Sequence, residues 1–251
     1  MAEIRTKPGK LRIGFNTGSP LGNEVHPDCI AAVKKAATIL EDLGHRVEEA
    51  KPDINGMALG HSYIVMYYAE TAADITRSEQ LTGVKPRRTD FEGTTWALGM
   101  LGKEFSAHDF VLAIRQWDSA ARAMGRFHET YDLYLTPTVA EPPTHIGELK
   151  PKPYEKAGMN LINTLGLGKL LKATGMAEQM ALFNLGKTPF TQLANFTGQP
   201  AMSVPLYWTA DGLPLGVQFI APFGDEATLF RLAAQLELAV PWFKKRPPIT
   251  G

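Results

Sequence analysis

The segment 188–237 constrains the fold of this chain most, because it places two apolar runs, a turn and a capped helix in a fixed order. The runs 201–207 and 215–220 are short and rich in residues that favour strands, and the Asp211-Gly212 pair between them is typical of a hairpin turn. We therefore predict two strands that pair across this turn. Pro205 offers no amide donor, which disfavours a central place in the sheet for the first strand.

Helices are predicted on both sides of these strands. Residues 192–197 form a short helical turn that Gly198 ends, as glycine commonly does after a helix. Asp225 stands where an N-cap belongs, and apolar residues then recur at helical spacing to about Ala239.

The rest of the chain alternates between strand and helix patterns. A strand at 11–15, a helix from Pro27 to Gly44 and a strand at 46–49 form a βαβ unit, which favours neighbouring parallel strands. The remaining expected elements are helices at 57–81, 89–101 and 107–130, a strand at 133–136, a surface loop at 137–153 and broken helical pieces at 160–184. The pattern predicts an α/β fold, a mixed β-sheet flanked by helices. Because no repeat or linker is visible, we expect residues 1–251 to form a single domain or part of one.

Charge and hydropathy exclude several kinds of partner. The chain has 26 basic and 26 acidic residues, so no global field favours nucleic acid or an anionic membrane. The first ten residues contain no apolar signal or anchor segment, and no apolar run approaches the length of a membrane span. We therefore expect a cytoplasmic protein with no membrane or nucleic-acid partner.

Cys29 is the single cysteine, which excludes an internal disulfide and a multi-cysteine metal site. It stands near the start of a predicted helix, where a thiol pKa can be lowered. A reactive thiol and an ordinary buried thiol are both open interpretations, and we favour the buried one.

Many positions of the segment 188–237 match one family pattern. The C-terminal part of amidase-signature hydrolases has a sequence similar to FTxxxNxTGxPAxSVP followed by GLPxGxQxxxPxxxExxLxxxAxxxE. The matching residues here are Phe190, Thr191, Asn195, Thr197, Gly198, Pro200, Ala201, Ser203, Pro205, Gly212, Leu213, Pro214, Gly216, Gln218, Pro222, Glu226, Leu229, Ala233 and Glu237.

The resemblance extends over nearly the whole chain. Upstream, Tyr131-Asp132 with the Leu-Thr-Pro-Thr run at 135–138 resembles the family's YDxxLTPT strand. Residues 11–50 resemble the family's module of an LRIGxxxG strand, a helix and an LGHxVEEA segment. Residues 90–99, DFEGTTWALG, are similar to the branch that includes cyclic-dimer hydrolases of nylon oligomers and broad-specificity amidases.

The resemblance implies a catalytic apparatus that this chain lacks. Family enzymes use a nucleophilic serine, a second serine on a cis peptide and a lysine base, carried by a motif like GGSSGGS in their N-terminal half, and no such motif occurs here. None of the six serines has a Gly-x-Ser-x-Gly setting or a lysine three positions on. His128-Glu129 lacks the second histidine of a zinc motif. We predict no catalytic residue, no metal and no cofactor in this chain, which resembles the C-terminal half of an enzyme.

In the family this half completes the mixed sheet and supplies much of the acyl-side pocket wall. The candidate substrate-binding residues are Tyr67, Tyr68, Trp96, Phe183 and Asn184, because aromatic groups on helices beside a sheet commonly line apolar pockets. Ordinary core positions are the alternative for each. Asn195, Thr197 and Gln199 are further candidates whose alternative role is to satisfy backbone amides.

Three functional hypotheses follow. The first is the C-terminal portion of an amidase that hydrolyses carbon–nitrogen bonds of a small-molecule amide when an N-terminal half completes it. The second is a catalytically inactive, truncated family member or interaction module. The third, a small-molecule-binding α/β domain unrelated to hydrolysis, is disfavoured by the match at 188–237. A sheet cut through its middle leaves an unpaired edge, so we also expect a homodimer or marginal stability.

Overall fold

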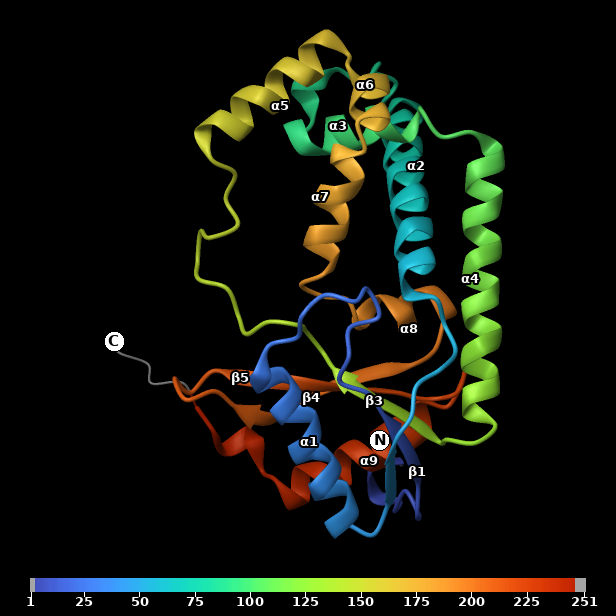
Figure 1. The fold of residues 1–251 in the computed structure, drawn as a ribbon, viewed down its shortest axis with the longest axis vertical. Helices are drawn as coiled ribbons and strands as arrows, with labels where there is room; N and C mark the ends of the chain where they lie inside the picture. Colours follow the sequence, from blue (N-terminus) through green and yellow to red (C-terminus); the bar gives the residue numbers. More distant parts are fainter. Residues whose placement is uncertain (1–2, 247–251) are drawn as a thin grey trace. The chain divides into compact units, whose positions relative to one another are not determined.

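A computed structural model describes residues 3–246 (Figure 1). The strands are β1 (Arg12–Phe15), β2 (Arg46–Glu49), β3 (Leu133–Pro137), β4 (Ala201–Trp208) and β5 (Pro214–Ile220). The helices are α1 (Pro27–Asp42), α2 (Gly56–Thr82), α3 (Gly93–Gly102), α4 (Ala107–His128), α5 (Pro153–Leu165), α6 (Gly168–Ala173), α7 (Met176–Leu185), α8 (Thr191–Thr197) and α9 (Glu226–Ala239). Short 3-10 turns lie at Glu3–Arg5, Arg88–Asp90 and Trp242–Lys244.

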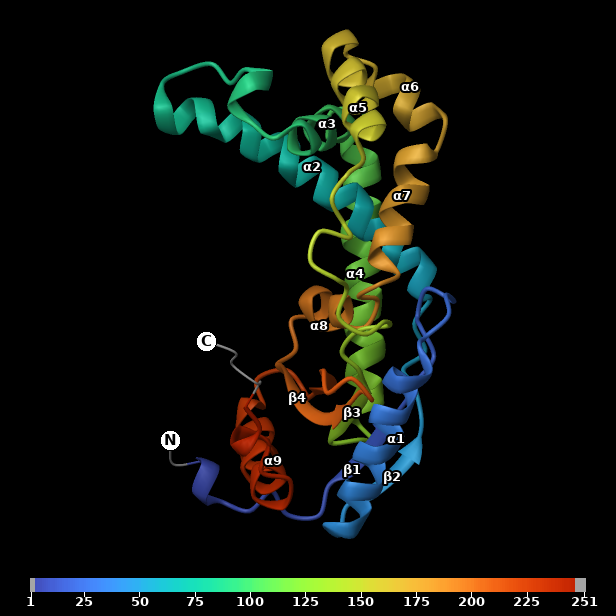
Figure 2. The same cartoon turned by 90° about the vertical axis from the view of Figure 1, so that its left-hand side faces the viewer.

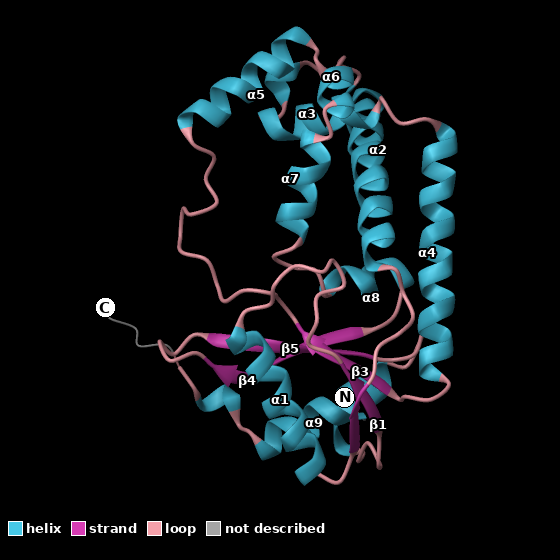
Figure 3. Cartoon of the chain, viewed as in Figure 1, coloured by secondary structure: helices cyan, strands magenta, loops and turns pink. Residues whose placement is uncertain are grey.

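The five strands form one mixed sheet in the order β2-β1-β3-β5-β4, drawn in magenta in Figure 3. Strand β1 pairs in parallel with β2 and β3, and β5 pairs antiparallel with β3 and β4. This confirms the predicted α/β class, the parallel βαβ unit and the hairpin across Asp211-Gly212. The sheet therefore changes from parallel to antiparallel at β3.

The predicted caps and stops explain where the flanking helices begin and end. Pro27 is the first residue of α1, and the side chain of Asp225 accepts a hydrogen bond from the amide of Thr228 at 3.2 Å to cap α9. Gly198 follows α8 with a φ of 73°, a conformation that a side chain rarely adopts. The proline, glycine and aspartate that predicted the ends of these helices therefore stand at those ends in the structure.

Two apolar clusters cover the two faces of the sheet. The larger one joins α1 and α9 to the sheet and includes the fully buried Ile13, Leu133 and Phe219. The smaller one includes Met124 of α4 and Ala194 of α8. Figure 1 shows α1 and α9 on one side of the strands and α8 on the other. Central strand β3 is buried at every residue, as expected for a strand covered on both faces.

Chain contacts divide the described residues into two compact units. The sheet unit comprises residues up to 55, 119–143 and from 186 onward, and the helical unit comprises 56–118 and 144–185. The boundary falls within α4. Whether the chain behaves as a single domain or as part of one stays a prediction.

Within the helical unit, α3 lies alongside α2 (Figure 2), and glycines make their approach close. A Cβ added at Gly102 would lie 1.9 Å from the carbonyl oxygen of Tyr68, and one at Gly99 would lie 2.4 Å from Cδ1 of Ile75. Only glycine fits between these helices at such distances. The expected helix at 89–101 in fact starts at Gly93, after the Arg88–Asp90 turn.

The expected broken helix at 160–184 consists of α5, α6 and α7, separated at Gly166 and Gly175, both with positive φ. The loop before α5, pink in Figure 3, confirms the predicted surface loop. Within residues 3–246, no helix combines the length and the apolar character that crossing a membrane requires.

Candidate substrate-pocket wall

The five residues chosen from the sequence all lie in the helical unit. Tyr67 and Tyr68 are on α2, Trp96 is on α3, and Phe183 and Asn184 are on α7. Their side chains differ widely in exposure. The buried ones hold helices together, and the exposed ones are accessible to a ligand.

Tyr68 is a structural contact between α2 and α7. Its side chain is 4% exposed, and its phenol donates a hydrogen bond to the carbonyl oxygen of Ala177 at 3.2 Å. Burial, together with the nearby carboxylate of Glu178, raises the pKa of Tyr68 to about 12. The phenol is therefore neutral and acts as a donor, which makes Tyr68 a residue that positions α7.

Tyr67 is the accessible member of an aromatic group on α2. Its ring stacks on that of Tyr63 with centroids 5.4 Å apart and remains 46% exposed. The ring of Tyr68 lies between Tyr67 and Phe105, 6.3 Å from each. The rings of Tyr68 and its two neighbours are tilted against each other by 49° and 46°, and Tyr68 is buried, so Tyr67 is the ring of this row that reaches the surface most.

An ion pair joins the same two helices next to this row. His61 Nδ1 of α2 contacts the carboxylate of Glu178 on α7. Both side chains are about half exposed, so the pair contributes little to stability but sets polar groups beside the aromatic surface. No sequence pattern predicts this pair, because the two residues lie 117 positions apart.

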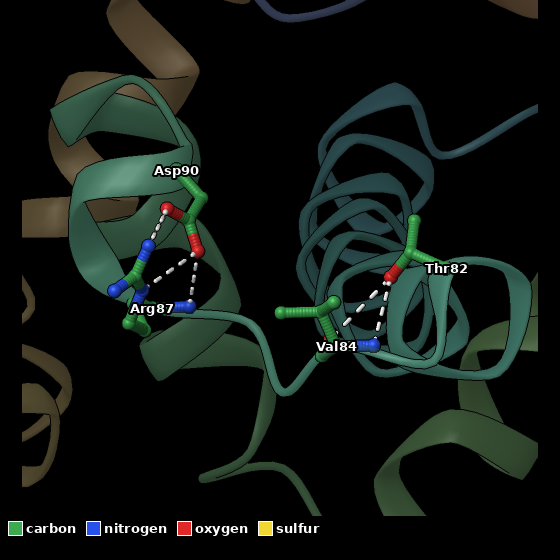
Figure 4. Close-up of polar contacts among 4 residues, drawn as sticks. All are labelled: Thr82, Val84, Arg87 and Asp90. Atoms are coloured by element: carbon green, nitrogen blue, oxygen red, sulfur yellow. Dashed lines mark hydrogen bonds and ion pairs between the residues drawn. The ribbon is translucent and has the colours of Figure 1, made fainter.

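A turn held by side-chain hydrogen bonds precedes α3, the helix that carries Trp96. Asp90 accepts a hydrogen bond from the amide of Arg87 at 2.9 Å and pairs with its guanidinium at 3.3 Å (Figure 4). The amide hydrogen bond is the main cause of the lowered pKa of Asp90, so the turn is held by a charged carboxylate. On the other side of this loop, Thr82 bonds to the amide of Val84 at 3.2 Å. The half-buried Trp96 ring then lies 6.0 Å from that of Phe91.

Phe183 and Asn184 lie away from the buried face of α7. That face is formed by Ala177, Ala181 and Leu182, which pack with Tyr68, whereas Phe183 is 73% exposed and Asn184 is exposed. The structure thus joins Tyr67 and Tyr68 to one aromatic row and places Phe183 and Asn184 on open surface. Substrate contact by any of the five stays a prediction.

One serine hydroxyl lies beside a carboxylate: Ser106 donates to Asp109 at 2.9 Å, and the same carboxylate accepts from the Ser106 amide, which caps the start of α4. Ser62 and Ser203 instead bond to neutral groups. Ser62 donates to the carbonyl oxygen of Leu59 at 2.8 Å and accepts from the indole of Trp117 at 3.0 Å. Ser203 on β4 bonds to the hydroxyl of Thr138 at 2.7 Å. Neither bond supplies a proton acceptor strong enough to activate a nucleophile.

Two of the further candidates, Thr197 and Gln199, make local hydrogen bonds. Thr197 donates to the carbonyl of Leu193 at 2.9 Å and contacts the amide oxygen of Gln199 at 2.7 Å. These two residues line a surface depression of about 460 Å³ in the sheet unit. The other lining residues are Ala121, Gly125, His128, Glu129, Pro222 and Phe223.

His128, which has no partner for a zinc motif in the sequence, is a partly buried titratable group of this depression. Its Nδ1 lies 2.9 Å from the carbonyl oxygen of Tyr131, and burial lowers its pKa. Because a carbonyl only accepts, Nδ1 carries a proton, and burial disfavours a second proton on the ring. Its Nε2 is buried, without a hydrogen-bond partner among the described residues.

Cys29 is 2% exposed, and burial is the main cause that raises the pKa of its thiol to about 11. The interpretation of Cys29 as a reactive thiol is therefore wrong. Its place near the start of α1 does lower a thiol pKa in general, but packing under the sheet outweighs that effect.

Comparison with known proteins decides the family. A family model described as Amidase matches residues 1–230. The chain belongs to the amidase family. It is 32% identical over 252 residues to the 6-aminohexanoate-cyclic-dimer hydrolase of Paenarthrobacter ureafaciens, covering 98% of this chain and 47% of that protein. It is 34% identical to the lipoamidase of Enterococcus faecalis, over 90% of this chain and 31% of that protein.

Solved amidase structures agree. A 6-aminohexanoate cyclic dimer hydrolase complexed with substrate superposes with a TM-score of 0.78 and 30% identity, covering 98% of this chain and 48% of that one. A bacterial aryl acylamidase, at 19% identity and a TM-score of 0.68, shows the same fold. The chain thus spans about half the length of the first amidases that it matches, and it corresponds to their C-terminal half.

Proposed function

We propose that this chain is the C-terminal portion of an amidase-family hydrolase of carbon–nitrogen bonds, to which it contributes scaffold and substrate-pocket wall. The observation that carries the proposal is the extent of the match: 98% of this chain superposes on only 48% of a cyclic dimer hydrolase. The nucleophile and its base then come from an N-terminal half. Ser62 and Ser203, bonded to backbone, tryptophan and threonine groups, and Ser106, whose carboxylate partner caps a helix, support this division.

The aromatic row on α2 is the part of the pocket wall that we assign to substrate. Tyr67 presents an exposed ring, the buried Tyr68 holds α7 against α2, and Trp96 adds a half-buried ring on α3. Phe183 and Asn184 supply an exposed apolar group and an exposed amide on α7. A small linear or cyclic amide with methylene chains matches such a surface, because the rings contact the chains and the polar groups orient the amide. A cytoplasmic location agrees with this role.

The test is an amide hydrolysis assay with and without the missing half. The chain alone is expected to release no product from 6-aminohexanoate cyclic dimer or a simple aryl amide. Addition of the N-terminal half of the Paenarthrobacter relative is expected to restore product release. A Tyr67→Ala change should then raise KM more than it lowers kcat, whereas Leu81→Ala, at an exposed position of the same helix, serves as control.

Two results would overturn the proposal. Hydrolysis by the chain alone would contradict the absence of a nucleophile. A stable complex of the two halves with no hydrolysis of any amide tested would instead support the alternative, a catalytically inactive family member that acts as an interaction module.

A further inference from the structure

The N-terminal arm, residues 3–11, is fixed to the sheet unit at both of its ends. At one end, the guanidinium of Arg231 on α9 forms an ion pair with the carboxylate of Glu3 at 2.5 Å. At the other end, the amide of Leu11 donates a hydrogen bond to Nδ1 of the buried His45 at 3.1 Å. Figure 2 shows the first turn of the arm beside α9. The residues between these two anchors are therefore held in place against the sheet unit.

A depression of about 540 Å³ lies between this arm, α9 and the turn that follows α1. Ile4, Leu43 and Leu238 give it an apolar part, and Leu238 is 86% exposed. The volume falls within the range of small-molecule sites, which is about 300–1,000 Å³. The depression belongs entirely to the sheet unit and contains none of the residues that we assign to the amide substrate.

The depression concentrates positive charge. Arg5, Lys7, Lys10 and Arg231 line it, and none of the described residues that line it is acidic. Glu3 pairs with Arg231, whereas the three cations of the arm form no ion pair within residues 3–246. Because the whole chain has 26 basic and 26 acidic residues, this excess is local and does not follow from composition. The electrostatic potential of the depression therefore favours an anion.

A fixed hydrogen-bond donor lies among these cations. Nδ1 of His45 accepts from the Leu11 amide, so the ring proton is on Nε2, which lies 2.9 Å from Oε1 of Gln235 on α9. This hydrogen bond orients the Gln235 side chain, which lines the depression. The amide nitrogen of Gln235 can only donate, and it has no partner in the described part of the chain. A ligand that offers acceptor oxygens and negative charge thus finds both kinds of partner here.

We propose that this depression binds a small organic anion with a phosphate or carboxylate head and a short hydrocarbon body. The head contacts Lys7, Lys10 and the amide nitrogen of Gln235. The hydrocarbon body contacts Leu43 and Leu238, which removes their apolar surface from water. The site does not depend on the proposed function, because it uses neither the aromatic row nor a partner half.

Titration of the isotope-labelled chain with hexyl phosphate, followed by NMR, tests the site. The side-chain amide signals of Gln235 should shift, with a Kd below about 1 mM. Hexanoate carries the other head, and the tighter of the two ligands identifies the preferred one. The absence of a shift at Gln235 with both ligands would overturn the proposal.

Two further ligands separate the head from the hydrocarbon body. Hexylammonium has the same chain with a positive head and should cause no shift at Gln235. Inorganic phosphate lacks the chain and should bind at least about fivefold more weakly than hexyl phosphate. Binding of hexylammonium equal to that of hexyl phosphate would overturn the anionic specificity. Equal binding of the two phosphates would overturn the role of Leu43 and Leu238.

A matched pair of variants tests the fixed donor. Gln235→Glu keeps an oxygen that accepts from His45 and replaces the amide donor with a carboxylate oxygen, so it should weaken hexyl phosphate binding at least about tenfold. Lys34→Gln changes the net charge equally at an exposed position of α1 outside the depression, and it should bind within about twofold. Circular dichroism confirms that both variants are folded. Unchanged binding by Gln235→Glu, or an equal loss in Lys34→Gln, would overturn the proposal.

The lysines of the arm are tested by a double variant. Lys7→Ala combined with Lys10→Ala removes two of the four cations and leaves both anchors of the arm in place. Hexyl phosphate binding should weaken at least about tenfold, and in the unchanged chain it should weaken as salt rises from about 50 to about 500 mM. Binding that survives the double variant and does not respond to salt would overturn the proposal.

Discussion

The sheet unit and the helical unit bury their apolar residues to very different degrees. In the sheet unit, strands β1, β3 and β5 contribute fully buried residues such as Ile13, Leu135 and Phe219. In the helical unit, α5 to α7 leave large apolar side chains exposed, namely Tyr154, Leu161, Leu165, Leu170, Met176, Met180 and Phe183. A sheet covered on both faces completes its own core, whereas short helices around α2 do not. The sheet unit is therefore the scaffold, and the helical unit is the part whose surface remains available.

The largest expected effect contrasts two phenylalanines. Phe219→Ala in the centre of the sheet should lower the free energy of unfolding by about 3–5 kcal/mol, because it leaves a cavity in a fully buried site. Phe183→Ala, at a 73% exposed position, should change it by at most about 0.5 kcal/mol. Urea unfolding measures both. Similar losses would contradict the contrast between a closed core and an open helical surface.

Gly102 tests the packing of the helical unit, and Gly125, on the part of α4 that belongs to the sheet unit, serves as its control. Gly102→Ala should cost about 1–3 kcal/mol, because the new methyl group would collide with the backbone of Tyr68. Gly125→Ala on α4 meets no atom within 4 Å and should stabilise its helix by about 0.5–1 kcal/mol. Thermal unfolding of the two variants should therefore shift in opposite directions. A neutral Gly102→Ala would mean that α2 and α3 are loosely packed.

Tyr68 makes the stability of the helical unit depend on pH. Removal of its phenol in Tyr68→Phe should cost about 1 kcal/mol, because one hydrogen bond to Ala177 is lost. Its folded pKa of about 12 is raised above the ordinary value of 10.0, so the stabilisation is complete below pH 10 and is lost as pH rises toward 12. Unfolding measured at pH 9 and 11 should show a smaller decline in Tyr68→Phe than in the unchanged chain. Tyr63, whose pKa is also raised, stays in both proteins and so cancels.

The smallest expected effect is at Cys29 in the sheet unit. A buried thiol with a pKa of about 11 should not react measurably with a disulfide reagent at pH 8 while the chain is folded. Denaturant should then expose it and allow full reaction. Rapid labelling of the folded chain would show that α1 opens locally and would weaken the distinction between a rigid sheet unit and an accessible helical one.

Much of the fold could be predicted because its signals are local. The turn at Asp211-Gly212, the cap at Asp225 and the proline at the start of α1 each act within a few residues, so the sequence predicts the elements they bound. The prediction for 89–101 was less accurate, because the hydrogen bonds between Arg87 and Asp90 form a separate turn before α3. Such side-chain bonds compete with a helix and are not visible as periodicity.

The candidate site was predicted less well, because its residues are joined only by the folded chain. The bond from Tyr68 to Ala177 and the pair of His61 with Glu178 bridge more than a hundred residues. The lowered pKa of His128 and the burial of Cys29 likewise depend on surroundings that distant segments supply.

The sequence by itself determined the amidase family, the half of the family that is present and the order of strands and helices, because these depend on short motifs and local spacing. Only the tertiary structure decided which strands form the edges, which of Tyr67 and Tyr68 is accessible, and that the single thiol is buried. Edges and burial are properties of neighbours in space, and the pairing of β5 between β3 and β4 is what brings segments 82 residues apart, such as Thr136 and Gln218, into contact.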